Sequence, residues 1–210
     1  QAYSLWGHKW FTSAPMCDGF LTLAKVSNTR NNAVDSSLQH TRSTCFLVPR
    51  WKPDQTRNTG FRIMRLKDKL ADRANASSEV EYHGAYGQMI GEEGKGLQTI
   101  LQMVQMTRLD CTLGAAGGAR KALSLALNHT HGRSAFGTPL INQPMMENVL
   151  TDLCITAEAC TLSALRMATA HARSTCGADA GLSSEVIQHE TSLFRVGVAI
   201  LKYFVTKQQP

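Results

Sequence analysis

The sequence predicts an α+β protein in which an antiparallel, barrel-like β domain precedes a bundle of long helices. Residues 1–87 contain short runs rich in β-branched and aromatic residues, separated by glycine, proline and polar turns. From Lys95 onward, apolar residues recur every three or four positions, which is the period of a helix. Strands followed by helices, without alternation, favour the α+β class. We therefore expect a β domain over residues 1–87 and a helical domain, itself incomplete, over residues 88–210.

The β domain is predicted from four short runs and from an opening stretch that also has the pattern of a strand. Residues 19–26 and 44–49 are apolar runs, whereas residues 60–64 and 79–82 alternate between apolar and polar side chains. The polar segment 27–42 contains three asparagines and no periodicity, so we expect a surface loop there.

Three helices are predicted after a switch marked by Gly84, Gly87 and the glycine-rich residues 91–96. The first is expected to run from Lys95 to His131 and the second over residues 144–172. A loop of small residues, 174–184, leads to the third. In the first helix, the Gly-Ala-Ala-Gly-Gly run from residue 114 is expected to let a neighbouring helix or a ligand approach closely. The third helix is expected to carry the apolar residues Leu193, Val196, Ile200, Tyr203 and Phe204.

Composition excludes several classes of protein. Hydrophobic residues make up 43% of the 210 positions and charged residues 18%, as in soluble globular chains, and no run of about 18 apolar residues predicts a membrane span. The net charge is +6, but the basic residues are scattered, so nucleic-acid binding is not indicated. The six cysteines form no CxxC pair, which favours reduced thiols in an intracellular compartment, either the cytoplasm or the mitochondrial matrix. His129 and His131 would diverge on a helix, so no metal site is predicted.

The short polar break between the first two helices, residues 131–144, is a candidate binding site. Besides Gly132, Gly137 and two prolines it carries Arg133, Phe136 and Gln143. A guanidinium, an aromatic ring and an amide at a helix corner suit a phosphate or nucleotide. The same residues also fit a solvated helical hairpin, and the residues alone leave both interpretations open.

A second candidate lies at residues 6–15, where Trp6, Trp10 and Phe11 stand beside the hydroxyls of Thr12 and Ser13. These side chains could bind a flat aromatic ligand or pack into the β core. Two weaker candidates are the Gly91–Gly96 loop and the pair Arg108 and Asp110. The loop lacks a phosphate-binding pattern and favours a simple connection. The charged pair favours a helix surface over a site.

Four stretches in order resemble motifs of the acyl-CoA dehydrogenase family: GHKWFTS from Gly7, KLADRANASSEVEY from Lys69, GEEGKG from Gly91, and RSAFGTP from Arg133. Within the family the chain is most similar to the AidB, or alkylation-response, branch. The stretches that indicate this branch are LKDKL from Leu66, MTRLDC from Met106 and PLINQPMM from Pro139.

This resemblance implies a three-domain flavoprotein that forms a homotetramer, binds FAD and oxidises the Cα–Cβ bond of an acyl-CoA thioester, passing electrons to an acceptor. Trp10, Phe11, Thr12 and Ser13 would lie along the flavin, with the hydroxyl of Thr12, or of Ser13, bonded to the reactive ring nitrogen. Arg133, Phe136 and Gln143 would meet the dinucleotide half of FAD across a subunit boundary. Arg108 would lie on the substrate side.

The resemblance also implies parts that these 210 residues lack, so we interpret the chain as an internal fragment. The catalytic base is expected beyond Pro210, because the alternate position of that base, just before Arg108, is Thr107. An alternative function is that of an AidB-type flavoprotein with a protective or DNA-associated role and weak dehydrogenation, in which DNA would be contacted only by a region beyond Pro210. A scaffold without cofactor is disfavoured, because residues for both halves of FAD are present.

Overall fold

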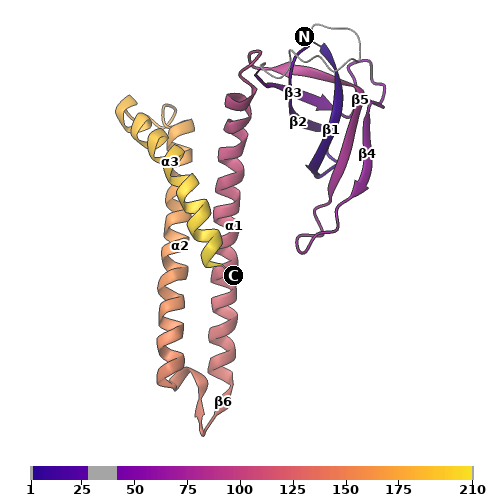
Figure 1. The fold of residues 1–210 in the computed structure, drawn as a ribbon. Helices are drawn as coiled ribbons and strands as arrows, with labels where there is room; N and C mark the ends of the chain where they lie inside the picture. The colour runs from indigo at the N-terminus through magenta and orange to yellow at the C-terminus, as the bar shows by residue number, and fades with distance from the viewer. Residues whose placement is uncertain (1, 28–41, 210) are drawn as a thin grey trace. The chain divides into compact units, whose positions relative to one another are not determined.

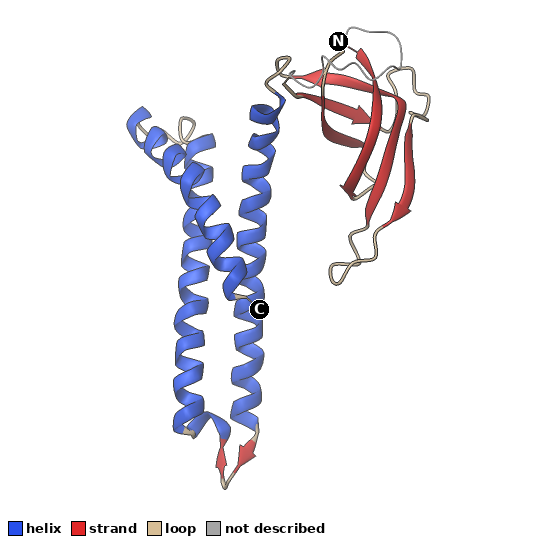
Figure 2. Cartoon of the chain, viewed as in Figure 1, coloured by secondary structure: helices blue, strands red, loops and turns tan. Residues whose placement is uncertain are grey.

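A computed structural model describes residues 2–27 and 42–209 of the chain, so most of the predicted loop at 27–42 lies outside the described residues. Contacts divide the chain into two compact units, Gln1–Gln102 and Met103–Pro210, and the division falls within the first long helix. Strands occupy the first unit and helices dominate the second (Figures 1 and 2). The predicted α+β class is confirmed.

The first unit is a curled antiparallel sheet of five strands built around β5. The strands are β1 (Ala2–Ser13), β2 (Gly19–Ala24), β3 (Thr44–Pro49), β4 (Phe61–Leu66) and β5 (Ser77–Ile90). Their order is β1-β5-β3-β2, and β4 also pairs with β5. The long strand β5 therefore holds three neighbours, which lets one strand organise the whole sheet (Figure 1).

Strand β5 is much longer than the predicted run at 79–82, because two of its glycines do not end it. Gly87 pairs with Tyr3 inside the ladder, and a Cβ there would lie 2.7 Å from Leu5 Cδ1. Gly84 has φ +67°, and a Cβ would lie 3.3 Å from the ring of Trp6. These glycines let β1 approach β5 closely, a use that the sequence reading missed.

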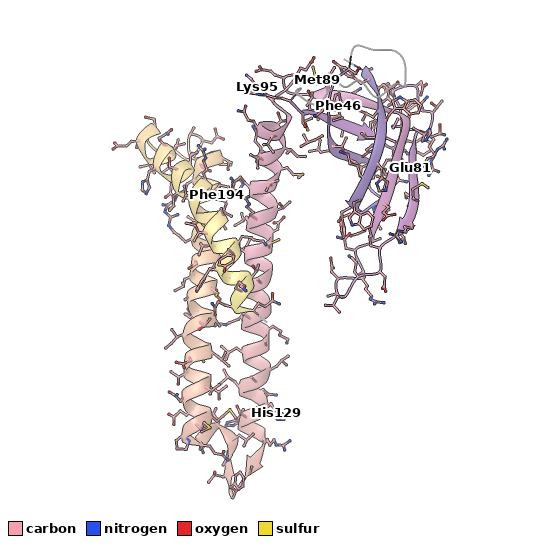
Figure 3. The ribbon with its side chains drawn as sticks, in the orientation of Figure 1. Phe46, Glu81, Met89, Lys95, His129 and Phe194 are labelled. Carbon is pink, nitrogen blue, oxygen red and sulfur yellow. The ribbon has the colours of Figure 1, made fainter. Side chains whose placement is uncertain are left out.

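One face of the sheet forms an apolar core. Alternate residues of a strand point to the same face, so strands β1, β3 and β5 each contribute to it. Its buried members are Leu5, Phe46, Val48, Val80, Tyr82 and Ala85. Phe46, on β3, is one of the largest fully buried side chains (Figure 3).

The two strands that flank β5 at Glu79, β1 and β4, each carry a bulge there. On β1, Lys9 pairs with Val80 and Thr12 with Ser78, so Trp10 and Phe11 together face the single residue Glu79. On β4 the register shifts between Ile63 and Arg65, and Arg65 pairs with Glu79. A bulge interrupts the alternation of side chains and re-aims them, so the period of two fails at this point of the sheet.

The three long helices are close to their predicted positions. They are α1 (Gly96–Gly132), α2 (Pro144–Cys176) and α3 (Ser184–Gln208). Between α1 and α2 lie the short strands β6 (Ser134–Ala135) and β7 (Thr138–Pro139) and the 3-10 turn η2 (Leu140–Asn142). Within the second unit, α1 and α2 run antiparallel and α3 returns against them (Figure 1).

Two apolar clusters join the helices of the second unit. Around Phe194 (Figure 3), one cluster contains Leu109 of α1 with Met167 and Ala170 of α2. In the other, Ala115 and Ala116 of the small-residue run pack against α2 and α3. A Cβ at Gly118 would lie 2.8 Å from Gln209 Nε2, so part of this run does permit close approach.

An ion-pair cluster also ties α2 to α3. The carboxylate of Glu190 is buried and accepts bonds from Arg166 at 2.9 and 3.1 Å and from Arg173 at 3.1 Å. These guanidinium groups, Arg166 first, hold the pKa of Glu190 below its ordinary value.

The six cysteines are all free thiols. Among the described residues, none of the helices is long and apolar enough to cross a membrane.

Candidate functional site

The aromatic residues at the end of β1 are displayed rather than buried. Trp10 is 57% exposed and Phe11 is 65% exposed, so the alternative in which they pack into the β core is wrong for both. The bulge opposite Glu79 explains this, because it turns two successive side chains outward. Lys9, just before them, has a structural role: its ammonium donates to the carbonyl of Leu23 at 2.8 Å, and burial lowers its pKa.

A charged cluster supports this aromatic pair. Lys67 Nζ lies 3.1 Å from the centroid of the Trp10 ring and 5.0 Å from that of Phe11, and it donates to Glu79 Oε1 at 2.7 Å. Arg65 donates to both oxygens of Glu79 at 2.8 Å, and its Cζ lies 5.7 Å from the Trp10 centroid. Hydrogen bonds from Arg65, then from Lys67, lower the pKa of Glu79 to about 2.

An open groove of about 610 Å³ runs along this cluster. It is lined by Trp10, Phe11, Arg65, Leu66, Lys67, Asp68, Lys69 and Leu70. Apolar rings and cationic side chains therefore share one surface, which suits a planar ligand that carries negative charge. Lys67 and Glu79 were missed by the sequence analysis, which noted LKDKL only as a motif. The pairing of β4 and β1 with β5 is what brings these residues together.

The two hydroxyls that follow Phe11 differ in their partners. Ser13 Oγ lies 3.1 Å from Ser77 Oγ, so it is bonded within the sheet. Thr12 is half-buried, and its carbonyl accepts from Ser78 Oγ at 3.2 Å. Its own hydroxyl forms no hydrogen bond with residues 2–27 or 42–209. Of the two hydroxyls, that of Thr12 is the one without a hydrogen-bond partner among the described residues.

The break between α1 and α2 folds as a tight hairpin that displays an aromatic ring. Phe136 and Gly137 form its turn with φ of 55° and 85°, the left-handed pair of a two-residue β-hairpin. Phenylalanine rarely adopts this φ, and Phe136 is 99% exposed. Such strain at an exposed tip is typical of a binding element.

The rest of this hairpin is held by its own hydrogen bonds. Gln143 Nε2 donates to the carbonyl of Ala135 at 3.0 Å, and Leu140 N donates to that of Arg133 at 2.8 Å. The side chain of Arg133 is exposed, and its guanidinium forms no ion pair or hydrogen bond within the part of the chain that the structure describes. The hairpin thus presents a free cation beside a free aromatic ring.

Of the two weaker candidate sites, the Gly91–Gly96 loop does not form a phosphate-binding site, and Arg108 and Asp110 do not pair among the described residues. In the Gly91–Gly96 loop, Gly94 N donates to Thr44 Oγ1 at 2.9 Å and Gly96 N to Ser43 O at 2.8 Å. These groups are occupied by the start of β3, so the loop is a connection and not a phosphate cradle. Arg108 is partly buried and forms no ion pair with Asp110. In residues 2–27 and 42–209, no three His, Cys, Asp or Glu side chains come together as metal ligands.

Comparison with known sequences decides the family. Residues 94–207 match the profile described as "Acyl-CoA dehydrogenase, C-terminal domain", which covers more than half of the chain. The chain belongs to the acyl-CoA dehydrogenase family. The resemblance drawn from the four motifs is therefore confirmed.

Two relatives in the acyl-CoA dehydrogenase family are much longer than this chain. It is 44% identical to the Escherichia coli protein AidB over 169 residues, which are 80% of this chain and 29% of AidB. It is 29% identical to acyl-CoA dehydrogenase family member 11 of Caenorhabditis elegans over 208 residues, which are 99% of this chain and 32% of the relative. The chain thus spans about a third of the length of these proteins.

Solved structures of the family share the fold. The Caenorhabditis elegans protein ACDH-11 in complex with C11-CoA superposes with a TM-score of 0.83 at 28% identity, covering 99% of this chain and 33% of that one. An acyl-CoA dehydrogenase from Bacillus anthracis complexed with FAD gives a TM-score of 0.70 at 17% identity, covering 99% and 35%. The second likeness concerns the fold alone.

The structure brings the predicted site residues of this family member together in two groups. Trp10, Phe11, Thr12 and Ser13 are neighbours at the end of β1 in the first unit. Arg133, Phe136 and Gln143 are neighbours on the hairpin of the second unit.

Proposed function

We propose that this chain is part of an FAD-dependent acyl-CoA dehydrogenase that oxidises the Cα–Cβ bond of an acyl-CoA thioester. The observation that carries the proposal is the end of β1, where an exposed Trp-Phe pair stands beside a hydroxyl without a partner among the described residues. The C11-CoA held by the Caenorhabditis elegans relative supports an acyl-CoA substrate.

The β1 surface fits the flavin half of the cofactor. Trp10 and Phe11 offer apolar ring surface, and Thr12 offers a free O–H donor within two residues of it. FAD, when bound, accepts the hydride removed from the substrate. A fixed donor aimed at the atom where negative charge develops stabilises that charge without reorganisation, an effect of roughly 2.7–4 kcal/mol. Thr12 is our choice for this donor, because Ser13 is bonded to Ser77.

The hairpin fits the dinucleotide half. The planar guanidinium of Arg133 can bind a pyrophosphate with two parallel bonds, and Phe136 offers a ring for stacking. Gln143 keeps its amide oxygen and one N–H available, since Nε2 uses only one donor toward Ala135. We propose that this hairpin reaches FAD across a subunit boundary of a homotetramer, with Arg108 on the substrate side and an external electron acceptor.

The experiment compares Thr12→Val with Ser13→Ala in the full-length protein. We expect Thr12→Val to slow reduction of bound flavin by acyl-CoA by about a hundredfold, because one donor is lost from a dry site. We expect Ser13→Ala to remain within a few-fold of the parent, since its hydroxyl faces Ser77. Anaerobic stopped-flow absorbance of the flavin measures both. The reverse result would assign the donor to Ser13, and two unchanged variants would remove β1 from the flavin site.

A second candidate function is that of an AidB-type flavoprotein with a protective or DNA-associated role. The 44% identity to AidB is the observation in its favour. The same anaerobic measurement separates the two candidates: a parent protein that binds FAD but is not reduced by any acyl-CoA would support this second function over the first.

A further inference from the structure

Lys67 is the most enclosed cation of the groove described above. Its side chain is only 9% exposed, and that of Glu79, its partner, is 10% exposed. Enclosing an ammonium is unfavourable unless a carboxylate compensates for the lost water. The protein supplies this carboxylate from β5, at a position where the strands on both sides, β1 and β4, bulge.

The same ammonium is placed against the indole of Trp10. At 3.1 Å from the ring centroid, it covers one face of a side chain that is otherwise 57% exposed. An indole with so much exposed surface has little packing to fix it. Two other groups lie farther from this ring, Arg65 Cζ at 5.7 Å and the His8 ring at 6.5 Å between centroids, so the Lys67 ammonium makes the closest of these contacts and should contribute most to the orientation of the indole. Glu79 in turn fixes the ammonium at 2.7 Å, and Arg65 holds Glu79 from the other side at 2.8 Å.

The cluster is also unbalanced in charge. Arg65 and Lys67 contribute two positive charges, whereas Glu79 contributes a single negative charge. Asp68 and Lys69 also line the groove and carry opposite charges, so one positive charge remains among the groups around the aromatic surface. A cation beside a redox group favours the form of that group that carries more negative charge.

We propose that Lys67 is a positioning residue of the β1 surface, whose ammonium, fixed by Glu79, orients the indole of Trp10 and favours the reduced form of the flavin. The second half of this inference rests on the proposed FAD site, and the first half does not. Lys67 touches neither substrate nor reacting atoms in this scheme. It acts through Trp10 and through its charge.

The first measurement needs no cofactor. The full-length, flavin-free protein is labelled with fluorotryptophan, and the fluorine resonance of Trp10 is assigned by its loss in Trp10→Phe. We expect Lys67→Met to shift and narrow this resonance, because the ring loses the cation and gains freedom. We expect Lys67→Arg to restore most of the parent signal, since a guanidinium also binds an aromatic face.

The second measurement is the midpoint potential of the bound flavin. We expect Lys67→Met to weaken the preference for reduced over oxidised flavin by about tenfold, which lowers the potential by about 30 mV for a two-electron couple. Lys67→Arg should keep the parent potential. Lys69→Met is the matched control: this lysine lines the same groove and pairs with Asp72 at 3.8 Å, but the cations over the Trp10 ring among the described residues are Arg65 and Lys67. It should leave the Trp10 resonance unchanged.

The outcomes separate this inference from the proposed function. A Trp10 resonance that is the same in Lys67→Met and the parent would overturn the positioning role, whatever the flavin does. A shifted resonance in a protein that binds no FAD would support that role while the proposed function fails. A shifted resonance with an unchanged potential would overturn the electrostatic half alone. If Lys67→Met does not fold by circular dichroism, Glu79→Gln replaces it, with the same expected shift, because the freed ammonium no longer stays on the ring.

Discussion

At the scale of single residues, Glu79 makes the β unit sensitive to acid. Its pKa is about 2 in the folded protein, against an ordinary 4.5, because Arg65 and Lys67 bond to it. The folded state therefore holds this proton more weakly than the unfolded state does. The stabilisation is complete above about pH 4.5 and is lost as the pH falls toward 2.

We expect urea unfolding of Glu79→Gln, followed between pH 7 and pH 2.5, to show this dependence. The difference in free energy of unfolding between parent and variant should be largest near neutral pH and should shrink below about pH 4.5. Glu92→Gln is the control, since the Glu92–Lys95 pair is solvent-exposed and such pairs contribute little. A parent–variant difference that stays constant with pH would contradict the role of Glu79.

The sequence alone identified the aromatic and hydroxyl residues of β1 but not the charges behind them. Trp10, Phe11 and Thr12 are consecutive, so a motif can display them. Lys67 and Glu79 are 12 residues apart and meet Trp10 only through two strand pairings and two bulges. A bulge shifts the register of a strand pair, and a single sequence carries no pattern that marks its position. This part of the groove therefore could not be predicted.

At the scale of elements, the helices hold together through a few buried side chains such as Phe194. This residue of α3 is 8% exposed and packs with Leu109 of α1 and Met167 of α2. We expect Phe194→Ala to lower the free energy of unfolding of the helical unit by about 3–5 kcal/mol, the usual cost of such a cavity. Lys202→Ala, an exposed change on the same helix, should stay within about 0.5 kcal/mol. Thermal unfolding by circular dichroism measures both, and equal effects would contradict this packing.

Helices were easier to predict than strands, for a physical reason. The three long helices were expected from a period of 3.6 that persists over many turns, and the observed ends of the first two differ from the predicted ends by four residues or fewer. The predicted strand was shorter than β5 because glycine usually interrupts a strand. Gly87 instead lies inside β5, where the absence of a side chain makes room for Leu5. That contact is set by the distant strand β1, so local sequence carries no sign of it.

At the scale of the whole molecule, the proposed FAD site depends on the hairpin as well as on β1. A charge-assisted bond of the kind proposed for Arg133 contributes roughly 1.5–3 kcal/mol. We therefore expect Arg133→Ala to weaken FAD retention in the full-length protein by about tenfold or more. Arg195→Ala, which removes an exposed arginine from α3, is the control. Ultrafiltration with flavin fluorescence measures retention, and an Arg133→Ala protein that retains FAD like the parent would refute the assignment.

The same substitution tests whether one site draws on two subunits. In each symmetric pair of subunits within the proposed homotetramer, each site would take Trp10 from one subunit and Arg133 from the other. Subunits carrying Trp10→Ala and subunits carrying Arg133→Ala should each retain FAD poorly. Random pairing of the two restores about one site in four, because a mixed dimer has one intact site and one doubly altered site. If both residues serve the site of their own subunit, mixing restores none, so FAD retention after co-expression distinguishes a shared site from a separate one.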